Sequence, residues 1–509
     1  MKRQILFFAL ALAAMTAVAQ DLNQNEWHFT TNADGTATVT NYEHPAKVWI
    51  NGMETWGTTT SDCYTGDLEI PSVTPEGLTV TGIGKECFRD CKSLSSIKIP
   101  NTIKTIGDAA FQSCHLLKEI TIPGSVERME RCAIWSCDGI ETVTIEDSPV
   151  TLVMASGYEM FRSLPALKYI YQGRNMVSED NSWKYVFRMM SGPVETIEQG
   201  VQVTQIAAGE FEDNKSLKIV RLSPNLTVIP RYAFSGCEAL EEVEANAVTS
   251  IGESAFNYCY ALRATPDLSH CKEILQWAFA NCKSIERLVI PASVDTLGYG
   301  VFSNTEALTE VVVEDADRPL KVGSSGMFRS ANSIKKAYFG RNAESTEYLQ
   351  YAIIENNPSV EEITFAGSCS YLRGSEFAGC TSLKSVRLGR NMKNIASRAF
   401  GWSSGQLENL TTLICEATTP PECEDGAFDA IDKEKCTLYV PAESIGLYKE
   451  ANEWKKFFSI ESGISATQAN TNRVTATYTL GGQRTTAAMR GLVIQRMNDG
   501  TTRKVLVNP

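Results

Sequence analysis

The chain has 509 residues, of which 43% are hydrophobic, 21% charged and 9% aromatic, so wholesale disorder and a collagen-like fold are excluded. Lys and Arg total 47 and Asp and Glu total 60, which gives a net charge of −13. Nucleic acids and anionic membranes need clustered positive charge, so we expect neither as a partner. The four histidines are His28, His44, His115 and His270. No two of them share a helical turn, which argues against most metal and acid–base sites.

The first residues have the pattern of a secretory signal peptide. A cationic start, residues 1–4, precedes the apolar run 5–14, and Ala17-Val18-Ala19 supplies a small-residue cleavage site. We therefore expect residues 1–19 to be removed after Ala19. No later stretch reaches ~18 uninterrupted apolar residues, so we expect no transmembrane segment and a secreted or outer-surface location.

An internal repeat dominates the rest of the chain. The pattern Ile-Gly-x-x-Ala-Phe-x-x-Cys-x-x-Leu-x-x-Ile-x-Ile-Pro occupies residues 106–123 and returns at 83–100 with one change. The Phe slot, with Ile at 134 and 353, recurs every 22 to 28 residues, most often every 23. Its positions are 88, 111, 134, 161, 187, 211, 234, 256, 279, 302, 328, 353, 377, 400 and 428. A period in the twenties with Leu and Ile at fixed offsets is typical of leucine-rich repeats.

Each repeat predicts one strand, Leu-x-x-Ile-x-Ile, whose alternate residues face a core. Pro or Gly ends that strand, and Ile-Gly-x-x-Ala-Phe returns the chain through a short helical turn. A single repeat cannot bury its apolar face, but stacked repeats bury it continuously. The predicted fold is a repeat solenoid, a horseshoe or arc of about 15 leucine-rich repeats.

The repeat resembles the BspA-like, or Treponema-type, leucine-rich repeats of bacterial surface proteins over about residues 63–460. Segments 34–39 and 64–71 are similar to the N-terminal opening of that family, and 438–457 to its closing cap. We therefore assign residues 20–75 to a β opening, 76–460 to the solenoid and 413–460 to its cap. The resemblance implies adhesion or protein binding.

A longer period indicates a duplication. Met160-Phe161-Arg162-Ser163 recurs as Met327-Phe328-Arg329-Ser330, and Gly173-Arg174-Asn175 recurs as Gly340-Arg341-Asn342. Irregular repeats stay in register, so we infer two seven-repeat blocks, about 76–245 and 246–412.

The last residues have a different pattern. The polar stretch 461–472 predicts a linker. Alternating segments 474–480, 491–497 and 503–507, the last two flanking Asn498-Asp499-Gly500, predict a β-tail over 473–509. The tail resembles the domain that ends many proteins exported by the type IX route; the alternative is a plain β-cap.

Seven cysteines share one position, three residues after the Phe slot: Cys91, Cys114, Cys137, Cys237, Cys259, Cys282 and Cys380. Asn214 and Thr305 replace Cys in that position, which indicates a small inward site that bonds to backbone. We expect buried thiols here, with disulfides as the alternative. Outside the position, Cys415 and Cys436 are the best disulfide candidates.

No catalytic motif is found. Cys114-His115 and His270-Cys271 lie in ordinary repeats, and adjacency in sequence does not orient a nucleophile and a base. We found no Gly-x-Ser-x-Gly, His-Glu-x-x-His, P-loop or EF-hand spacing. We expect no enzyme activity, no cofactor and no metal.

The outward positions of the repeat strands are the best candidates for binding. Tyr169, Tyr171 and Tyr338 lie there, and Arg174 and Arg341 follow in the adjoining turns. Tyr and Arg are favoured at interface hot spots, although exposed strands also use aromatic residues for cross-strand packing. These five residues form the predicted contact with a protein or glycan partner, in particular an extracellular host molecule.

The leading hypothesis is thus a secreted or surface-displayed binding protein, and the alternative is a structural spacer without a ligand. A contiguous aromatic or apolar patch on the sheet would favour binding, whereas an evenly charged sheet would favour a spacer.

Overall fold

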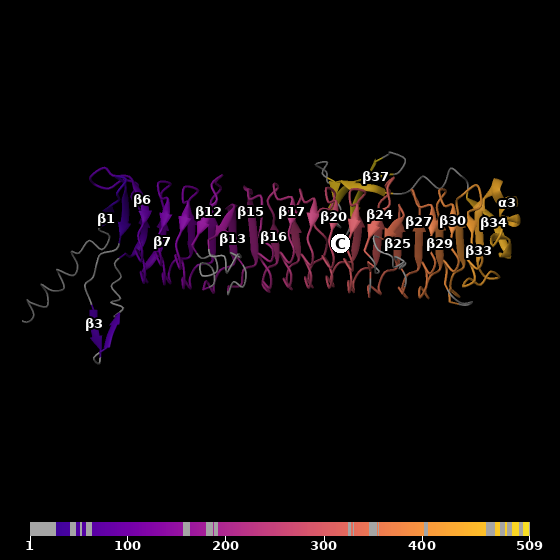
Figure 1. The fold of residues 1–509 in the computed structure, drawn as a ribbon, viewed down its shortest axis with the longest axis horizontal. Coiled ribbons are helices and arrows are strands. Elements are labelled where there is room, and N and C mark those ends of the chain that lie inside the picture. Colours follow the sequence, from indigo (N-terminus) through magenta and orange to yellow (C-terminus); the bar gives the residue numbers. More distant parts are fainter. Residues whose placement is uncertain are drawn as a thin grey trace, which may run out of the picture. The chain divides into compact units, whose positions relative to one another are not determined.

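We describe a computed structural model of the chain. It describes residues 27–40, 47–50, 53–56, 64–155, 163–179, 187, 192–323, 327–328, 330–345, 354, 356–401, 406–464, 474–478, 484–485, 491–497 and 502–507. The chain divides into two compact units, Met1–Val194 and Glu195–Pro509. Each unit is a β-solenoid in which strands of successive repeats lie side by side (Figure 1). The predicted signal peptide and its cleavage site lie outside the described residues.

The first unit contains parallel sheets and two hairpins. One sheet has the order β1-β2-β6-β8-β10-β12-β14, antiparallel between β1 and β2 and parallel elsewhere. Its strands are β1 (His28–Thr31), β2 (Ala37–Thr40), β6 (Val80–Ile83), β8 (Thr105–Ile106), β10 (Arg128–Met129), β12 (Leu152–Met154) and β14 (Met176–Ser178). The other wall consists of β5 (Gly66–Glu69), β7 (Leu94–Lys98), β9 (Glu119–Ile122), β11 (Thr142–Ile145) and β13 (Tyr169–Arg174), and β3 (Lys47–Ile50) pairs with β4 (Met53–Trp56).

The second unit repeats this arrangement. The longer strands are β15 (Thr196–Gln202), β16 (Ile219–Arg221), β18 (Glu242–Glu244), β21 (Arg287–Ile290), β23 (Glu310–Val313), β25 (Lys336–Phe339), β27 (Glu362–Phe365), β29 (Ser385–Leu388), β31 (Thr412–Cys415), β33 (Thr437–Pro441) and β34 (Ser459–Ile464). The second wall consists of β17 (Val228–Ile229), β19 (Ser250–Ile251), β20 (Glu273–Ile274), β22 (Thr296–Leu297), β24 (Leu320–Val322), β26 (Ala343–Ser345), β28 (Tyr371–Leu372), β30 (Asn394–Ile395) and β32 (Glu422–Cys423).

Each regular repeat therefore contributes two strands, not the single strand expected from the sequence. In residues 105–123, β8 is only two residues long and ends at the Ile of the Ile-Gly motif, while β9 is the predicted strand with alternating buried residues. The Gly of the motif has a steric role. A Cβ on Gly107 would lie 2.6 Å from the backbone nitrogen of Lys85 in the preceding repeat, so only glycine permits this approach.

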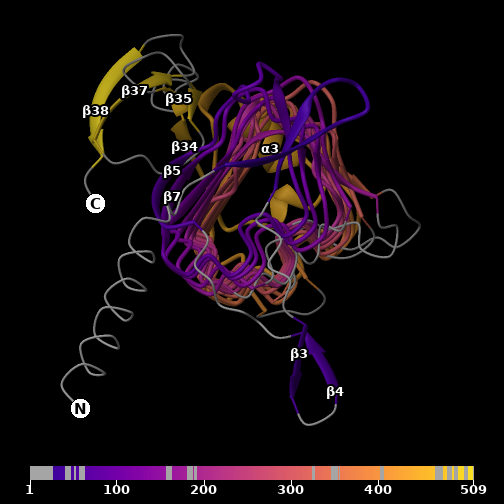
Figure 2. The same cartoon turned by 90° about the vertical axis from the view of Figure 1, so that its left-hand side faces the viewer.

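The return segment is a hydrogen-bonded turn and not the helical turn expected from the sequence. Around Phe111, Ala109 and Ser113 have left-handed backbones, with φ of 52° and 63°. The N–H groups of these three residues donate to carbonyls of the next repeat over 2.7 to 2.9 Å. Turns therefore bond to turns as strands bond to strands, and together they close the coil seen end-on in Figure 2.

Two ladders fill the core beneath the turns. Phenylalanine rings stack from repeat to repeat, as for Phe88 and Phe111 with centroids 5.1 Å apart and Phe256 and Phe279 at the same separation. The slot cysteines are buried thiols, as predicted, and most of them bond to the repeat before them: Cys114 Sγ donates to Phe88 O over 3.1 Å. Corresponding bonds join Cys137, Cys237, Cys259 and Cys282 to Phe111, Phe211, Phe234 and Phe256.

One position of the ring ladder differs from the sequence assignment. Cys380 donates to the carbonyl of Ile354, which is fully buried and takes the Phe position that we had assigned to Ile353. Ile353 itself lies outside the described residues, as does Phe161 of an earlier repeat.

The expected disulfide between Cys415 and Cys436 is wrong, because both are free thiols. The hydroxyl of Tyr448 lies 3.1 Å from the sulfur of Cys415, so the closing cap already packs against this thiol.

The closing cap ends the turn ladder. It comprises the 3₁₀ helices η1 (Ala442–Ser444) and η2 (Trp454–Lys456) and the helix α3 (Ile445–Glu450). Trp454 is buried with its ring centroid 4.7 Å from that of Phe428, the last ring of the ladder. The buried carboxylate of Glu453 accepts the N–H of Gly426 over 3.1 Å, so it replaces the carbonyl that a further repeat would offer.

The C-terminal residues form the predicted β-tail. Its strands are β35 (Val474–Tyr478), β36 (Arg484–Thr485), β37 (Gly491–Met497) and β38 (Thr502–Val507), all antiparallel. The predicted Asn-Asp-Gly turn lies outside the described residues.

Candidate functional site on the turn face

The outward side chains of the longer strands, here called the sheet face, are mostly paired with one another. Lys336 on β25 contacts Glu362 on β27 over 3.0 Å, and Arg287 on β21 contacts Glu310 on β23 over 2.9 Å. In the first unit Lys168 contacts Glu141 over 2.9 Å. Adjacent parallel strands place such residues opposite each other, so opposite charges meet at these positions, whereas the next outward pair on β21 and β23 is Val289 and Val312. The ion-paired part of the sheet face has the even charge that we associated with a spacer.

The predicted tyrosine anchors lie on this sheet face, half-buried. The hydroxyl of Tyr171 donates to Asp147 over 2.7 Å, and that of Tyr338 donates to Asp315 over 2.8 Å. Tyr169 lies opposite Thr142 on the neighbouring strand. Equivalent tyrosines in the two units thus make equivalent bonds, in keeping with the proposed duplication. Their polar tips are already engaged within the protein.

The predicted arginine anchors do not reach the surface. Arg174 is fully buried, and its guanidinium donates to the carbonyls of Pro123, Gly124 and Val126 over 2.7 to 3.0 Å. Burial lowers the pKa of Arg174 to about 10, an effect that Glu146 partly offsets. Arg341 is 1% exposed and donates to Pro291 O over 2.9 Å. Both therefore bind backbone two repeats earlier, in disagreement with the prediction that they contact a partner.

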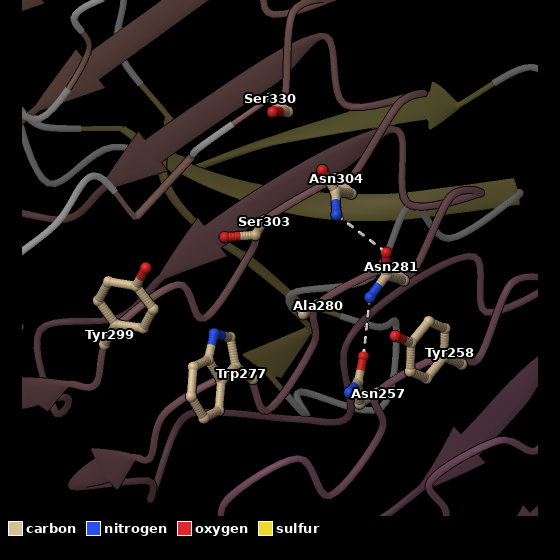
Figure 3. Close-up of a pocket in the computed structure, with 9 residues that line it drawn as sticks. All are labelled: Asn257, Tyr258, Trp277, Ala280, Asn281, Tyr299, Ser303, Asn304 and Ser330. Atoms are coloured by element: carbon tan, nitrogen blue, oxygen red, sulfur yellow. Dashed lines mark hydrogen bonds between the residues drawn. The ribbon is translucent and has the colours of Figure 1, made fainter.

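A hollow of about 430 Å³ opens instead on the outer side of the turns, here called the turn face, in the second unit. The described residues that line it are Asn257, Tyr258, Trp277, Ala280, Asn281, Tyr299, Ser303, Asn304 and Ser330 (Figure 3). Its depth follows from small side chains. Ala280 and Ser303 directly follow the Phe slot, where the first unit has Gln112 and Trp135.

Aromatic rings form the walls of the hollow. Trp277 and Tyr258 are 38% and 45% exposed, the former meeting Tyr299 edge to face at 5.4 Å. Trp277 and Tyr299 lie on one side of Ala280 and Tyr258 on the other (Figure 3). Most phenylalanine rings of the array are buried in the ladder, whereas Trp277 and Tyr258 both expose ring area to solvent at one hollow.

The two exposed aromatic residues have a strained backbone conformation. Trp277 and Tyr258 have φ of 53° and 63°, a left-handed conformation that disfavours side chains with a Cβ by roughly 1–2 kcal/mol. Asn281 and Asn304, which take the position of Tyr258 in the two later turns, have a residue type that tolerates it better. Gly300 makes room for the indole, because a Cβ there would lie 2.9 Å from Trp277 Cδ1.

An amide ladder runs along one side of the hollow. Asn304 Nδ2 donates to Asn281 Oδ1 over 3.0 Å, and Asn281 Nδ2 donates to Asn257 Oδ1 over 2.9 Å (Figure 3). These bonds leave Nδ2 of Asn257 and Oδ1 of Asn304 as the two ends of the ladder. The hollow therefore combines apolar ring faces with a fixed donor and a fixed acceptor.

None of the nine lining side chains carries a formal charge. Nearby charges are paired: Lys283 contacts Glu306 over 2.8 Å, and this bond raises the pKa of the lysine. Lys283 also lies 5.6 Å from the ring centre of Tyr260, which packs edge to face on Tyr258. The surface can thus hold a neutral ligand by stacking and hydrogen bonding, and it offers no ion pair.

Sequence reasoning missed this site. Three asparagines and three aromatic residues are spread over residues 257–304, and only the stacking of turns brings them together. A usable signal was present: Ala and Ser follow the Phe slot in consecutive repeats, and aromatic residues flank them.

A family comparison identifies the array. Residues 60–185, 181–309 and 320–419 match the model of the BspA type leucine rich repeat region, in six copies. The chain belongs to the BspA-type leucine-rich repeat family. This confirms the resemblance and the fold class that the sequence predicted. No match was found among curated proteins.

Solved leucine-rich repeat proteins are similar to this chain. A leucine-rich repeat protein from Bacteroides ovatus is 20% identical, covering 87% of this chain and 100% of its own, with a TM-score of 0.42. The T. pallidum leucine rich repeat protein is 20% identical over 46% of this chain and 87% of its own, with a TM-score of 0.28. A leucine rich cell surface protein from Faecalibacterium prausnitzii is 18% identical over 86% and 97%, with a TM-score of 0.23.

The described part of this BspA-type chain contains neither a membrane-spanning helix nor a cluster of metal-binding side chains. Its helices include none long and apolar enough to cross a membrane. Its His, Cys, Asp and Glu side chains form no group of three or more that could hold a metal ion.

Proposed function

We propose that this BspA-type protein is exported, is displayed at the outer cell surface and binds an extracellular protein or glycan through the turn-face hollow around Trp277. The observation that carries the proposal is the exposure of Trp277 and Tyr258 over a floor of Ala280, with unused amide ends beside them. Rigid aromatic rings with polar tips are favoured at recognition surfaces because their burial costs little side-chain entropy.

The N-terminal pattern and the β-tail support the export part of the proposal. Residues 1–19 would direct the chain out of the cytoplasm, and the tail after Val474 would act as a sorting domain of the type IX kind. Adhesion to host material is the role that fits a surface protein with such a hollow.

A structural spacer is the second candidate function, and the ion-paired sheet face favours it. Pairs such as Lys336 with Glu362 satisfy polar groups within the protein and leave little for a ligand. Tyr169, Tyr171 and Tyr338 stay the predicted partner contacts on that face. The two candidate functions make different predictions: a binding protein should lose ligand retention when an exposed contact residue is substituted, whereas a spacer should not.

The test is retention of the purified full chain on immobilised mucin-type glycoprotein, in glycosylated and enzymatically deglycosylated forms. We expect Trp277→Asn to reduce retention strongly, whereas Tyr171→Ser/Tyr338→Ser leaves it unchanged. Trp277→Asn should not unfold the protein, because the Trp277 side chain is 38% exposed and Asn tolerates the left-handed backbone of this position, which Ser254 occupies in the preceding turn.

Trp135→Gln is the matched control. Trp135 is 38% exposed, as Trp277 is, but it lies outside the hollow, and Gln112 occupies its place in the preceding repeat. Equal retention of all variants on both surfaces would refute the binding proposal and favour the spacer. Protease treatment of intact cells should release the protein if it is displayed at the surface.

A further inference from the structure

We propose that the turn-face hollow is a binding site for a neutral oligosaccharide chain lying along the stacking direction of the repeats. This inference rests on the proposed binding function and specifies the chemical class of its ligand.

The charge of the site selects against ionic ligands. None of the nine described lining residues is charged, the neighbouring Lys283 is held by Glu306, and the whole chain carries a net charge of −13. A sialylated or sulfated glycan, a nucleic acid or an acidic peptide would meet no cation in the lining and a repulsive overall field. A neutral ligand meets neither penalty.

The ring faces match the apolar face of a sugar. A pyranose has one face lined by C–H groups, and such a face packs flat on an exposed indole or phenol ring while its hydroxyls point outward. Trp277 and Tyr258 expose large ring areas that nothing in the described protein covers further. Their edge-to-face neighbours Tyr299 and Tyr260 fix the ring planes, so little freedom is lost on binding.

The amide ladder distinguishes a sugar from a proline-rich peptide, which also binds aromatic grooves. Nδ2 of Asn257 is a donor and Oδ1 of Asn304 is an acceptor, and neither takes part in the ladder bonds. A hydroxyl both donates and accepts, so hydroxyls can satisfy both ends. A polyproline segment offers carbonyl acceptors alone and would leave the Asn304 oxygen without a donor.

The dimensions of the ladder define the length of the ligand. Asn257, Asn281 and Asn304 belong to three successive turns, and two steps at the strand spacing span roughly 10 Å. That distance accommodates two to three sugar rings, so affinity should rise from a monosaccharide to a trisaccharide and then level off.

The experiment is a titration of the full chain with neutral oligosaccharides of increasing length, in α- and β-linked series, followed by indole fluorescence and calorimetry. Sialylated and sulfated forms of the same chains and a proline-rich peptide are included as competing ligand classes. We expect at least one neutral series to bind with the length dependence above. Trp277→Asn should weaken it by about tenfold or more, the effect expected for a hot-spot aromatic residue.

Two further variants sharpen the result. Asn304→Asp keeps an acceptor at the end of the ladder but removes the N–H that Asn304 donates to Asn281 Oδ1, so it should displace that acceptor and weaken the binding of neutral chains. Trp135→Gln should change nothing. Binding confined to the anionic glycans or to the peptide would overturn the oligosaccharide assignment, and so would an absence of binding across the neutral series.

The outcome is separable from failure of the proposed function. If the protein is retained equally on glycosylated and deglycosylated glycoprotein and retention depends on Trp277, the binding function stands and the glycan assignment is wrong. If retention requires the glycans, persists after their sialic acid and sulfate are removed and depends on Trp277, both stand.

Discussion

On the sheet face of the second unit, polar side chains of neighbouring repeats bond to one another, whereas on the turn face the same stacking leaves a hollow. Arg287 meets Glu310 because parallel strands place like positions side by side. Ala280 and Ser303 are too short to meet their neighbours, so Trp277 and Tyr258 stand at the edges of open space. In a regular array, side chains that are long enough to span one strand spacing bond to the next repeat and leave no hollow. Side chains that are too short leave a hollow between repeats.

The difference also concerns stability. The sheet face is held by exposed ion pairs, which contribute little. The turn face rests on stacked rings and buried thiols, which contribute through burial and cannot be screened by salt. The predictions below test this contrast, beginning with the largest effect.

Alkaline pH should destabilise the protein through its buried thiols. Burial raises the pKa of Cys237, Cys271, Cys369 and Cys436 from 9.0 to about 12 and that of Cys415 to about 11. Because the folded pKa exceeds the unfolded one, this stability is complete below pH 9 and is lost as the pH rises toward the folded values. Each thiol contributes a slope of about 1.4 kcal/mol per pH unit.

The measurement is urea unfolding under reducing conditions at several pH values above 9. Cys237→Thr, which introduces the residue found in the same slot at 305, should make the pH dependence shallower. A free energy of unfolding that stays constant with rising pH in this range would show that the thiols are not buried as described.

Arg174→Met should reduce stability by about 3 kcal/mol, because three buried backbone carbonyls lose a charged donor. Arg390 provides the matched control, since it occupies the same Gly-Arg-Asn motif but is exposed. Arg390→Met should change the thermal midpoint little. Equal effects of the two substitutions would contradict the distinction between the buried and exposed arginines.

Tyr338→Phe should cost about 1 kcal/mol or less, the net value of one hydrogen bond, here the one donated to Asp315. Ligand capture should not change, because the sheet face is not the proposed contact. A loss of capture with normal stability would return the binding site to the tyrosines first considered.

Arg287→Gln should have the smallest effect, below about 1 kcal/mol, since the ion pair with Glu310 is solvent-exposed. The difference from the unsubstituted protein should shrink further at high salt, as measured by denaturant unfolding. A larger, salt-independent loss would mean that the sheet face stabilises the array more than proposed.

The repeat made much of the fold predictable. The Phe slot was enough to predict stacked repeats, and the interchange of Cys with Asn214 and Thr305 was enough to predict buried thiols. The two-residue strand β8 was not predictable, because two residues show no periodicity. The burial of Arg174 was missed since its acceptors lie about fifty residues earlier in the chain. The hollow was missed for the related reason that its walls come from separate repeats.

The central claim is that a ligand contacts the turn face and not the sheet face, and hydrogen–deuterium exchange with and without a neutral oligosaccharide tests it most directly. The account predicts added protection at the turn amides of Tyr258, Trp277 and Asn281, whose N–H groups donate to the next turn beside the hollow. Exchange in β21 and β23 should be unchanged. Protection of those strands, with the turn amides unaffected, would contradict the account.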